Sequence, residues 1–339
     1  MKKITFLLIL NFGLLHLGLA QKLITVDNSL ESNAQYKNLQ QALDDASAND
    51  TIYVHPSVTN YGDIYLTKPV TLLGYSHSDP AIRTMVEKVF LQDGASNVNI
   101  NGFRVSISLG TPANNTSAIS DLTIQNCRIV SLLYFDGAGV NNLLLQGNVI
   151  EIFGSKTANY NNFSDAIIMN NVFTGPVYVT NHQSTILKNN MHIGGSGLTN
   201  MDSANGELDV QNSMFITKTD AWYGLNYNNT KVVFTNCLSY NSSSSLPVLN
   251  GENNKNNINP EFINGSTAWD PKLDYHLKSI SPAKGTGING EDMGIFNEGD
   301  FTFNNYGYAN GIPTVNITSL TPVVASDGQL EVNITTTSY

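Results

Sequence analysis

The hexapeptide Leu122-Thr123-Ile124-Gln125-Asn126-Cys127 shows the pattern that decides the fold. Apolar and variable residues alternate through its first four positions, an Asn follows, and a residue of modest size comes last. Alternation predicts a half-buried strand, and a Gly or Asn at the fifth position tolerates the positive φ of a sharp bend. The pattern recurs in hexapeptides that begin at Val70, Val98, Leu143, Ala166, Thr185, Leu208 and Val232.

The spacing of these copies selects the architecture. Their third residues, from Leu72 to Phe234, are separated by 28, 24, 21, 23, 19, 23 and 24 residues. One coil of three short strands and three turns needs about that many residues, and it stacks on the next coil at ~4.8 Å. A β-sandwich would place a turn roughly every 8 to 12 residues. The sequence therefore predicts an all-β, right-handed parallel β-helix in which the copies lie directly above one another.

The two ends of the repeat array carry different patterns. Leu39, Ala42, Leu43 and Ala46 fall on one face of a short helix, which is predicted to cap the first coil. After residue 300 an aromatic stretch leads into a β-rich tail, and we expect a small hairpin packed on the side or end of the β-helix. The predicted organisation is a signal peptide over 1–20, a β-helix domain over 21–300 and a C-terminal β tail or cap over 301–339.

Composition and the N-terminus restrict the compartment and the partners. Lys2 and Lys3 precede an apolar run from Ile4 to Leu15, and small residues follow up to Ala20, an order typical of a secretory signal. No later stretch of sequence is long and apolar enough to predict a membrane span. The formal charge of −10, from 17 basic and 27 acidic residues, argues against nucleic acid as a partner. We expect an exported monomer, secreted or held at the cell surface.

Several segments resemble a known family. The predicted helix followed by Asp50-Thr51-Ile52-Tyr53-Val54, and the strand Val70-Thr71-Leu72-Leu73-Gly74, are similar to the secreted right-handed parallel β-helix proteins of the pectate-lyase-like superfamily. Four later segments are similar to the C-terminal closing region of the bacterial members of this superfamily: Asn259 to Phe262, Asp274 to Leu277, Ser281 to Ala283 and Asp292 to Gly294. The resemblance implies the fold over roughly residues 23 to 300. It leaves the activity open, because the superfamily includes lyases, hydrolases, epimerases and non-enzymatic surface proteins.

Aromatic residues in the third strand of each coil are the candidates for ligand contact. That strand is predicted to include Leu132 to Phe135, Ile152-Phe153, Val177 to Val179, Trp222 to Leu225 and Pro247 to Leu249. Rings exposed on successive coils would form a platform for the faces of sugars. The predicted carbohydrate-contacting residues are Tyr134, Tyr178, Trp222 and Tyr223.

Lys188 is a weak candidate for catalysis. It is the only basic residue in the outward column that follows the anchors. In the uronate lyases that the chain resembles, a Lys or Arg on a sheet face abstracts the proton beside a carboxylate while acidic residues hold calcium. Nothing near Lys188 completes that set, so a solvated surface lysine is the favoured interpretation. The sequence has no metal-binding signature, and calcium is expected only if the lyase alternative holds.

The predicted register also places side chains inside the coils. Asn148, Asn171 and Asn190 are equivalent on three consecutive coils, where stacked amides can bond one another and the turn backbone. Cys127 and Cys237 share a column but lie five coils apart, at ~24 Å, which is too far for a disulfide.

Two groups of side chains predicted to point outward are expected to contact another part of the chain or a partner. Arg104 and Arg128 match on adjacent coils, and Asp93, Asp121 or Glu151 is a more natural counter-ion than an anionic sugar. The column through Leu144, Ile167 and Ile186 is apolar, and exposed apolar patches are usually covered. We expect the C-terminal tail to cover it, or failing that a partner protein.

These patterns favour an exported β-helix protein that interacts with extracellular or cell-surface polysaccharide and has little catalytic activity. One alternative is a polysaccharide lyase or glycoside hydrolase acting on an acidic polysaccharide. The other is a structural or adhesive surface protein that binds a protein partner through the Leu144 to Ile186 region.

Overall fold

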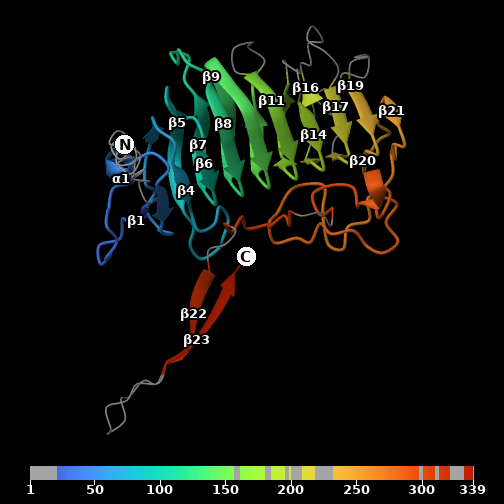
Figure 1. Ribbon diagram of the computed structural model, residues 1–339. Coiled ribbons are helices and arrows are strands. Elements are labelled where there is room, and N and C mark those ends of the chain that lie inside the picture. The colour runs from blue at the N-terminus through green and yellow to red at the C-terminus, as the bar shows by residue number, and fades with distance from the viewer. Residues whose placement is uncertain are drawn as a thin grey trace, which may run out of the picture.

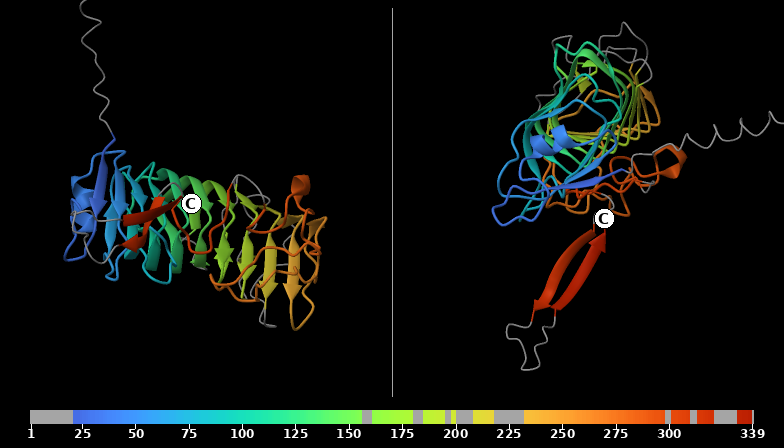
Figure 2. Two further views of the ribbon diagram at one scale, coloured as in Figure 1. Left: turned by 90° about the horizontal axis from the view of Figure 1, so that it is seen from below. Right: turned by 60° about the vertical axis from the view of Figure 1, so that its left-hand side comes forward.

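The computed structural model describes residues 21–155, 161–179, 185–194, 198–199, 208–217, 232–297, 301–309, 313–320 and 332–338. Within them the chain winds into a parallel β-helix with three faces, seen from the side in Figure 1 and closer to the axis in the right-hand view of Figure 2. The predicted signal peptide, Trp222 and Tyr223 lie outside the described residues.

Face A carries the repeated hexapeptides. Its strands are β1 (Leu23–Val26), β2 (Thr51–Val54), β4 (Thr71–Leu73), β6 (Asn99–Asn101), β8 (Ile119–Gln125), the last parts of β9 (Arg128–Gln146) and β11 (Asn161–Met169), β14 (Ile186–Lys188), β17 (Leu208–Gln211), β19 (Val232–Thr235) and β21 (Gly251–Glu252). Each strand pairs in parallel with the next, as the repeat predicts.

Faces B and C follow face A in every coil. Face B consists of the first residues of β5 (Met85–Leu91), β7 (Arg104–Thr111), β9 and β10 (Val149–Phe153), then β12 (Val172–Phe173), β15 (Met191–Ile193), β18 (Met214–Thr217) and β20 (Leu238–Asn241). Face C consists of β3 (Ile64–Leu66), the later residues of β5, β7 and β10, the middle of β9, β13 (Val177–Tyr178) and β16 (Leu198–Thr199).

The register confirms that the anchors form one column. Ile124 pairs with Leu145, Leu145 with Ile168, and Ile168 with Leu187. Side chains alternate between the two sides of a strand, so this register turns every anchor into the core. All of the anchors are buried. Cys127 and Cys237 are both free and buried, which confirms that they do not pair.

A polar ladder joins the coils at the bend between faces A and B. The backbone N–H of Asn148 donates to Asn171 Oδ1, and that of Asn171 donates to Asn190 Oδ1, both at 3.0 Å. Asn171 Nδ2 donates back to the Leu145 carbonyl at 2.9 Å. The residue before each ladder position is Asn or Gly with positive φ, for example 54° at Asn170. This backbone turn leaves N–H and C=O groups without a strand partner, and the buried amides satisfy them.

Aromatic rings stack in the core behind face B. The ring centroid of His192 lies 5.0 Å from that of Phe173 and 4.6 Å from that of Phe215, and both pairs are stacked. His192 is fully buried, and both of its ring nitrogens lack a hydrogen-bond partner. Burial lowers the pKa of His192 to about 3, so the ring is neutral and acts as one more aromatic disc in the stack.

The predicted helix caps the first coil. Helix α1 (Leu39–Asp45) begins after Asn38, whose side chain accepts a hydrogen bond from the Gln41 N–H. It buries Leu39, Ala42 and Leu43 against the end of the β-helix. Ala46 also lies in the core, and β2 begins soon after the turn at Asn49, where φ is 70°.

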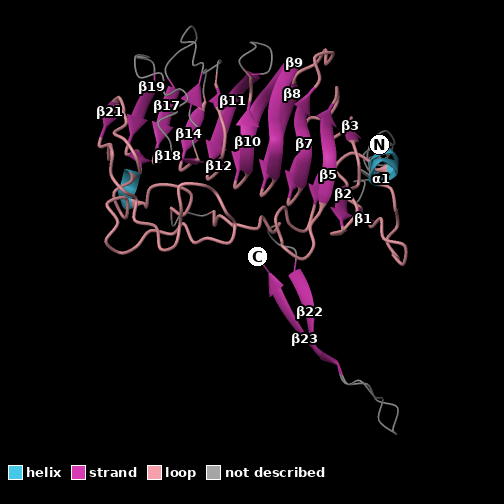
Figure 3. Cartoon of the chain, turned by 180° about the vertical axis from the view of Figure 1, so that it is seen from behind, coloured by secondary structure: helices cyan, strands magenta, loops and turns pink. Residues whose placement is uncertain are grey.

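A C-terminal strap, residues 260–297 and 301–309, runs back along the stack, as Figures 1 and 3 show. It follows the bend column from late coils to early ones. Asn236 Nδ2 donates to the Thr286 carbonyl, Asn170 Nδ2 to the Ile295 carbonyl, and the Ser76 hydroxyl to the Tyr306 carbonyl. The short 3-10 turn η3 (Ile288–Gly290) is anchored by Asn212 Oδ1, which accepts from the Ile288 N–H at 2.8 Å.

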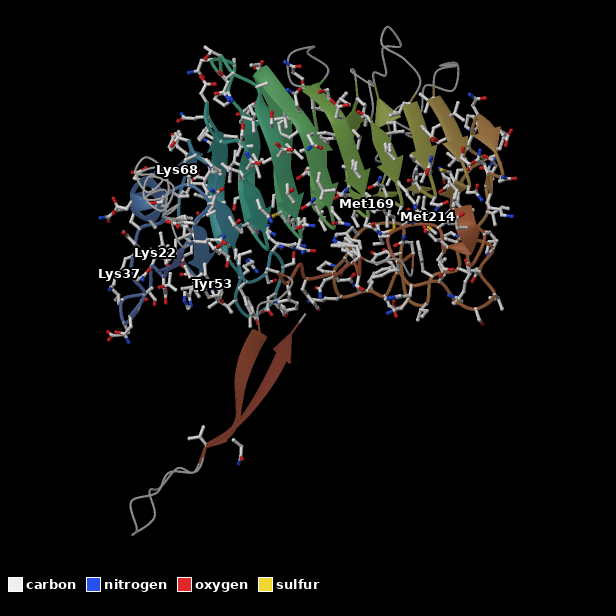
Figure 4. The ribbon with its side chains drawn as sticks, viewed as in Figure 1. Lys22, Lys37, Tyr53, Lys68, Met169 and Met214 are labelled. Atoms are coloured by element: carbon white, nitrogen blue, oxygen red, sulfur yellow. The ribbon has the colours of Figure 1, made fainter. Side chains whose placement is uncertain are left out.

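The strap covers face B, which corrects the expectation that the C-terminal region covers the Leu144 column. Met214 and its neighbours on face B form a second apolar cluster with Tyr275, Met293, Ile295 and Phe303 of the strap. Figure 4 shows Met214 on the side along which the strap runs. By contrast, Ile167 and Ile186 on face A remain 43% and 44% exposed. Face B is the more apolar surface, so covering it removes more apolar area from water.

The C-terminal hairpin forms but does not pack as expected. Strands β22 (Pro313–Leu320) and β23 (Val332–Ser338) pair in antiparallel fashion. Figures 1 and 2 show the pair projecting away from the β-helix, which corrects the prediction that it lies on the side or end. Residues 301–309, at the start of the predicted tail, belong instead to the strap.

Asn171→Leu tests the ladder. The change strands the Asn148 N–H and the Leu145 carbonyl, so we expect it to lower the free energy of unfolding by about 2 to 4 kcal/mol. Urea denaturation measures the loss. The control, Asn33→Leu, changes an exposed loop residue and should cost less than about 0.5 kcal/mol. An equal loss of unfolding free energy in the two variants would contradict the stabilising role of the ladder.

His192→Phe tests the buried ring. The unfolded chain binds a proton at this His below its ordinary pKa of 6.5, whereas the folded chain resists protonation down to about 3. The wild type therefore loses stability as the pH falls through this window, by up to about 1.4 kcal/mol per pH unit from this group. The variant should be the more stable protein in urea, and its advantage should be larger at pH 5 than at pH 7.5. A constant advantage would contradict the neutral buried His.

Candidate functional site

Aromatic residues line one outward column of face C. Tyr65 pairs with Phe90, Phe90 with Gly110, and Gly110 with Tyr134. Their strand neighbours point inward: Ile64, Leu66, Val89 and Leu91 are buried, whereas Tyr65 is 40% exposed. The period of two along a strand therefore turns these rings outward.

The same column continues through Gly154 to Tyr178. Leu133 pairs with Phe153, and Phe153 with Val177, all three buried in the core. The residues that follow them, Tyr134, Gly154 and Tyr178, therefore share the outward column. We call Tyr65, Phe90, Tyr134 and Tyr178 the aromatic strip.

Glycines set the spacing of the strip. The rings of Tyr65 and Phe90 stack on adjacent coils, with centroids 4.8 Å apart and planes 11° apart. Beyond Phe90, Gly110 and Gly154 occupy alternate coils, so successive rings lie two coils apart, roughly 10 Å. A Cβ atom on Gly110 would lie 2.0 Å from the Tyr134 backbone carbonyl oxygen and 2.7 Å from Tyr134 Cδ1 of the ring. Only glycine permits that approach.

Polar groups lie beside the early end of the strip. In the neighbouring outward column, Lys88 pairs with Ser108, Ser108 with Leu132, and Leu132 with Ile152. Lys88 Nζ is 3.9 Å from Asp63 Oδ2, and both side chains are about one-third exposed. A hydroxyl, an ammonium and a carboxylate thus stand next to the rings of Tyr65 and Phe90. They can exchange hydrogen bonds with ligand hydroxyl groups.

The strip contains two of the four predicted contact residues. Tyr134 and Tyr178 lie in it, while Trp222 and Tyr223 fall outside the described residues. Phe153 points into the core. Tyr65 and Phe90 were not predicted, although a recurring tripeptide marks the strip. An aromatic residue stands between two apolar ones in Ile64-Tyr65-Leu66, Val89-Phe90-Leu91, Leu133-Tyr134-Phe135 and Val177-Tyr178-Val179.

Lys188 lies on face A beside the strap. Its Nζ is 3.4 Å from Glu291 Oε2, and both side chains are about one-quarter exposed. The lysine is thus ion-paired with a carboxylate of the strap rather than simply solvated. A catalytic role for Lys188 stays a prediction. Within the described residues, no three His, Cys, Asp or Glu side chains cluster as a metal site.

Residues of the strap line an open pocket of about 470 Å³. Its lining includes Phe296, Phe301 and Phe303, with His276, Lys284 and Asp292 as the charged or titratable groups. Lys284 Nζ is 2.9 Å from Asp292 Oδ2, and His276 Nδ1 is 2.7 Å from Asp274 Oδ1. These polar groups already have partners within the strap, so they are less available to a ligand than those beside the aromatic strip.

Arg104 and Arg128 are in register on face B, but the expected counter-ions lie elsewhere. Asp93 accepts hydrogen bonds from Thr116 and Ser117, and Asp121 accepts one from Asn142. Glu151 attracts Arg128 only at longer range. Among the described residues, no carboxylate oxygen lies within 4.0 Å of either guanidinium group. A direct ion pair with Asp93, Asp121 or Glu151 is therefore not formed, although Glu151 attracts Arg128 at longer range.

Comparison with known proteins does not identify the chain. No protein-family model matches it, and no curated protein matches its sequence. In the described part of the chain, no helix has the length and apolar character needed to cross a membrane.

Proposed function

We propose that the protein binds an extended polysaccharide along the aromatic strip, with the glycan parallel to the axis of the β-helix. The observation that carries this proposal is the single outward column of Tyr65, Phe90, Tyr134 and Tyr178 on face C. Aromatic rings bury the apolar faces of sugars and discriminate little among them.

The spacing of the rings supports a chain ligand over a single sugar. From Phe90 to Tyr134 and from Tyr134 to Tyr178 the step is two coils, roughly 10 Å. Two sugar units of an extended glycan have about this length, so every second unit would meet a ring. Asp63, Lys88 and Ser108 would bind hydroxyl groups at one end of the bound chain, where the rings are closest together.

The wider context of the proposal comes from the sequence. The signal-like N-terminus and the resemblance to pectate-lyase-like β-helix proteins support an exported protein that meets polysaccharide outside the cell or at its surface. We propose binding without cleavage. The strip consists of aromatic rings, and the carboxylate beside it, that of Asp63, is paired with Lys88 and so is less available as an acid or base. A polysaccharide lyase that uses Lys188 and calcium is the alternative.

A second candidate function is adhesion to a protein partner. Ile167 and Ile186 are neighbours on face A, in register, and each is more than two-fifths exposed. Exposed apolar groups in contact favour association with another surface. This reading places the partner on face A and leaves the aromatic strip without a role.

Tyr134→Ala and Tyr178→Ala test glycan binding. Affinity electrophoresis of the mature protein in gels containing neutral and acidic polysaccharides would identify the ligand, and calorimetry with its oligosaccharides would measure the affinity. Each change removes one stacking ring, worth about 1 kcal/mol, and should weaken binding roughly fivefold. Tyr53→Ala is the matched control, because Tyr53 is a half-buried tyrosine on face A, labelled in Figure 4.

Three results would contradict the proposal. Absence of binding to the whole panel would favour adhesion, and equal losses in Tyr53→Ala and Tyr178→Ala would show that the strip is not the contact surface. Release of unsaturated uronate product in the presence of calcium, lost in Lys188→Ala, would establish the lyase alternative.

A further inference from the structure

All three arginines of this 339-residue chain come together on one side of the β-helix. Arg104 and Arg128 begin adjacent strands of face B and pair directly in the register. Met85 precedes them in the same column, and Arg83, two residues earlier, places its Nε 3.3 Å from Met85 Sδ. The other basic side chains are lysines spread along the chain. Arginine is thus confined to a single place in an acidic protein.

The three charges repel one another without a carboxylate between them. Burial, together with the charges of Arg128 and Arg83, lowers the pKa of Arg104 to about 10. At neutral pH the group still carries its charge. Asp270 of the strap and Glu151 attract Arg128, but neither forms an ion pair with it within 4.0 Å. The Asp79 carboxylate, four residues before Arg83, is bonded to Tyr308 and to the Ala81 N–H, and only the Asp79 backbone carbonyl accepts from Arg83 Nη1.

The residues packed beside the three arginines are polar but add no further charge. Ser78 Oγ is 3.4 Å from Arg128 Nη1 and 2.7 Å from His77 Nδ1. Burial lowers the pKa of His77 to about 3, helped by the charges of Arg128 and Arg104, so this ring is neutral. The three guanidinium groups are partly buried, and Asp270 and Glu151 offset their charge only at longer range, so an excess of positive charge remains.

We propose that Arg83, Arg104 and Arg128 form a binding site for an oxyanion, namely a carboxylate or sulfate group that is free in solution or carried by an acidic sugar. The planar fork of a guanidinium matches two oxygens of such a group, and each bond is charge-assisted. One bound anion would offset the repulsion among the three arginines. The site lies on face B and does not depend on the aromatic strip of face C.

Urea unfolding at low ionic strength tests the site. Sodium sulfate, sodium glucuronate and sodium chloride are compared at matched, low ionic strength, because a bound anion stabilises with saturation there, unlike screening or the general stabilising effect of sulfate. Sulfate or glucuronate should stabilise the wild type with a saturable dependence on concentration. The anion that gives the larger stabilisation indicates whether the site prefers a sulfate or a carboxylate group.

Arg104→Gln and Arg128→Gln should weaken the apparent anion affinity about tenfold or more. Arg104→Lys should lose part of the affinity, because a lysine keeps the charge but lacks the planar guanidinium that binds two oxygens. Without anion, Arg104→Gln should be at least as stable as the wild type, since it removes repulsion. Lys272→Gln, which removes an exposed charge elsewhere, should respond as the wild type does. The proposal is overturned if sulfate and glucuronate act no differently from chloride, or if the Arg104 and Arg128 variants retain the full response.

Discussion

The structure depends on the hydrogen bonds that join one coil to the next at the bend between faces A and B. From Cys127 onward, the side chain of the next coil accepts the backbone N–H of the coil before it, as Asn171 does for Asn148. The preceding residue turns the chain with a positive φ, at Asn170 for example. A shift of one residue would expose the core and leave these buried groups unpaired, so the bend holds these coils in the same phase.

Because the coils share one phase, equal positions line up as columns along the axis. Inside, this produces the stack of Phe173, His192 and Phe215, in which a neutral histidine takes an aromatic place. Outside, it aligns the aromatic strip on face C and brings Arg104 beside Arg128 on face B. The strap extends the same principle, since it bonds the outward bend residues and covers the apolar side of face B.

The local part of this structure could be predicted from the sequence. The repeated alternation and the bend residues specify face A, the ladder of Asn148, Asn171 and Asn190, and the separation of the two cysteines. The strap could not be predicted, because its contacts join residues far apart in the chain, such as Ser76 and Tyr306. The third strand has no fixed bend residue to mark its register in the sequence, so only the strand pairing places Tyr65 and Phe90 in the strip.

The distance between two spin labels in the aromatic strip tests the shared phase most directly. Tyr65→Cys and Tyr178→Cys provide the labelling sites, while Cys127 and Cys237 are buried and their pKa values are raised to about 12, which keeps these native thiols unreactive. The two sites are five coils apart in one column, so we expect a single distribution centred near ~24 Å. A distance well beyond about 35 Å, or several separate distances, would contradict a continuous strip.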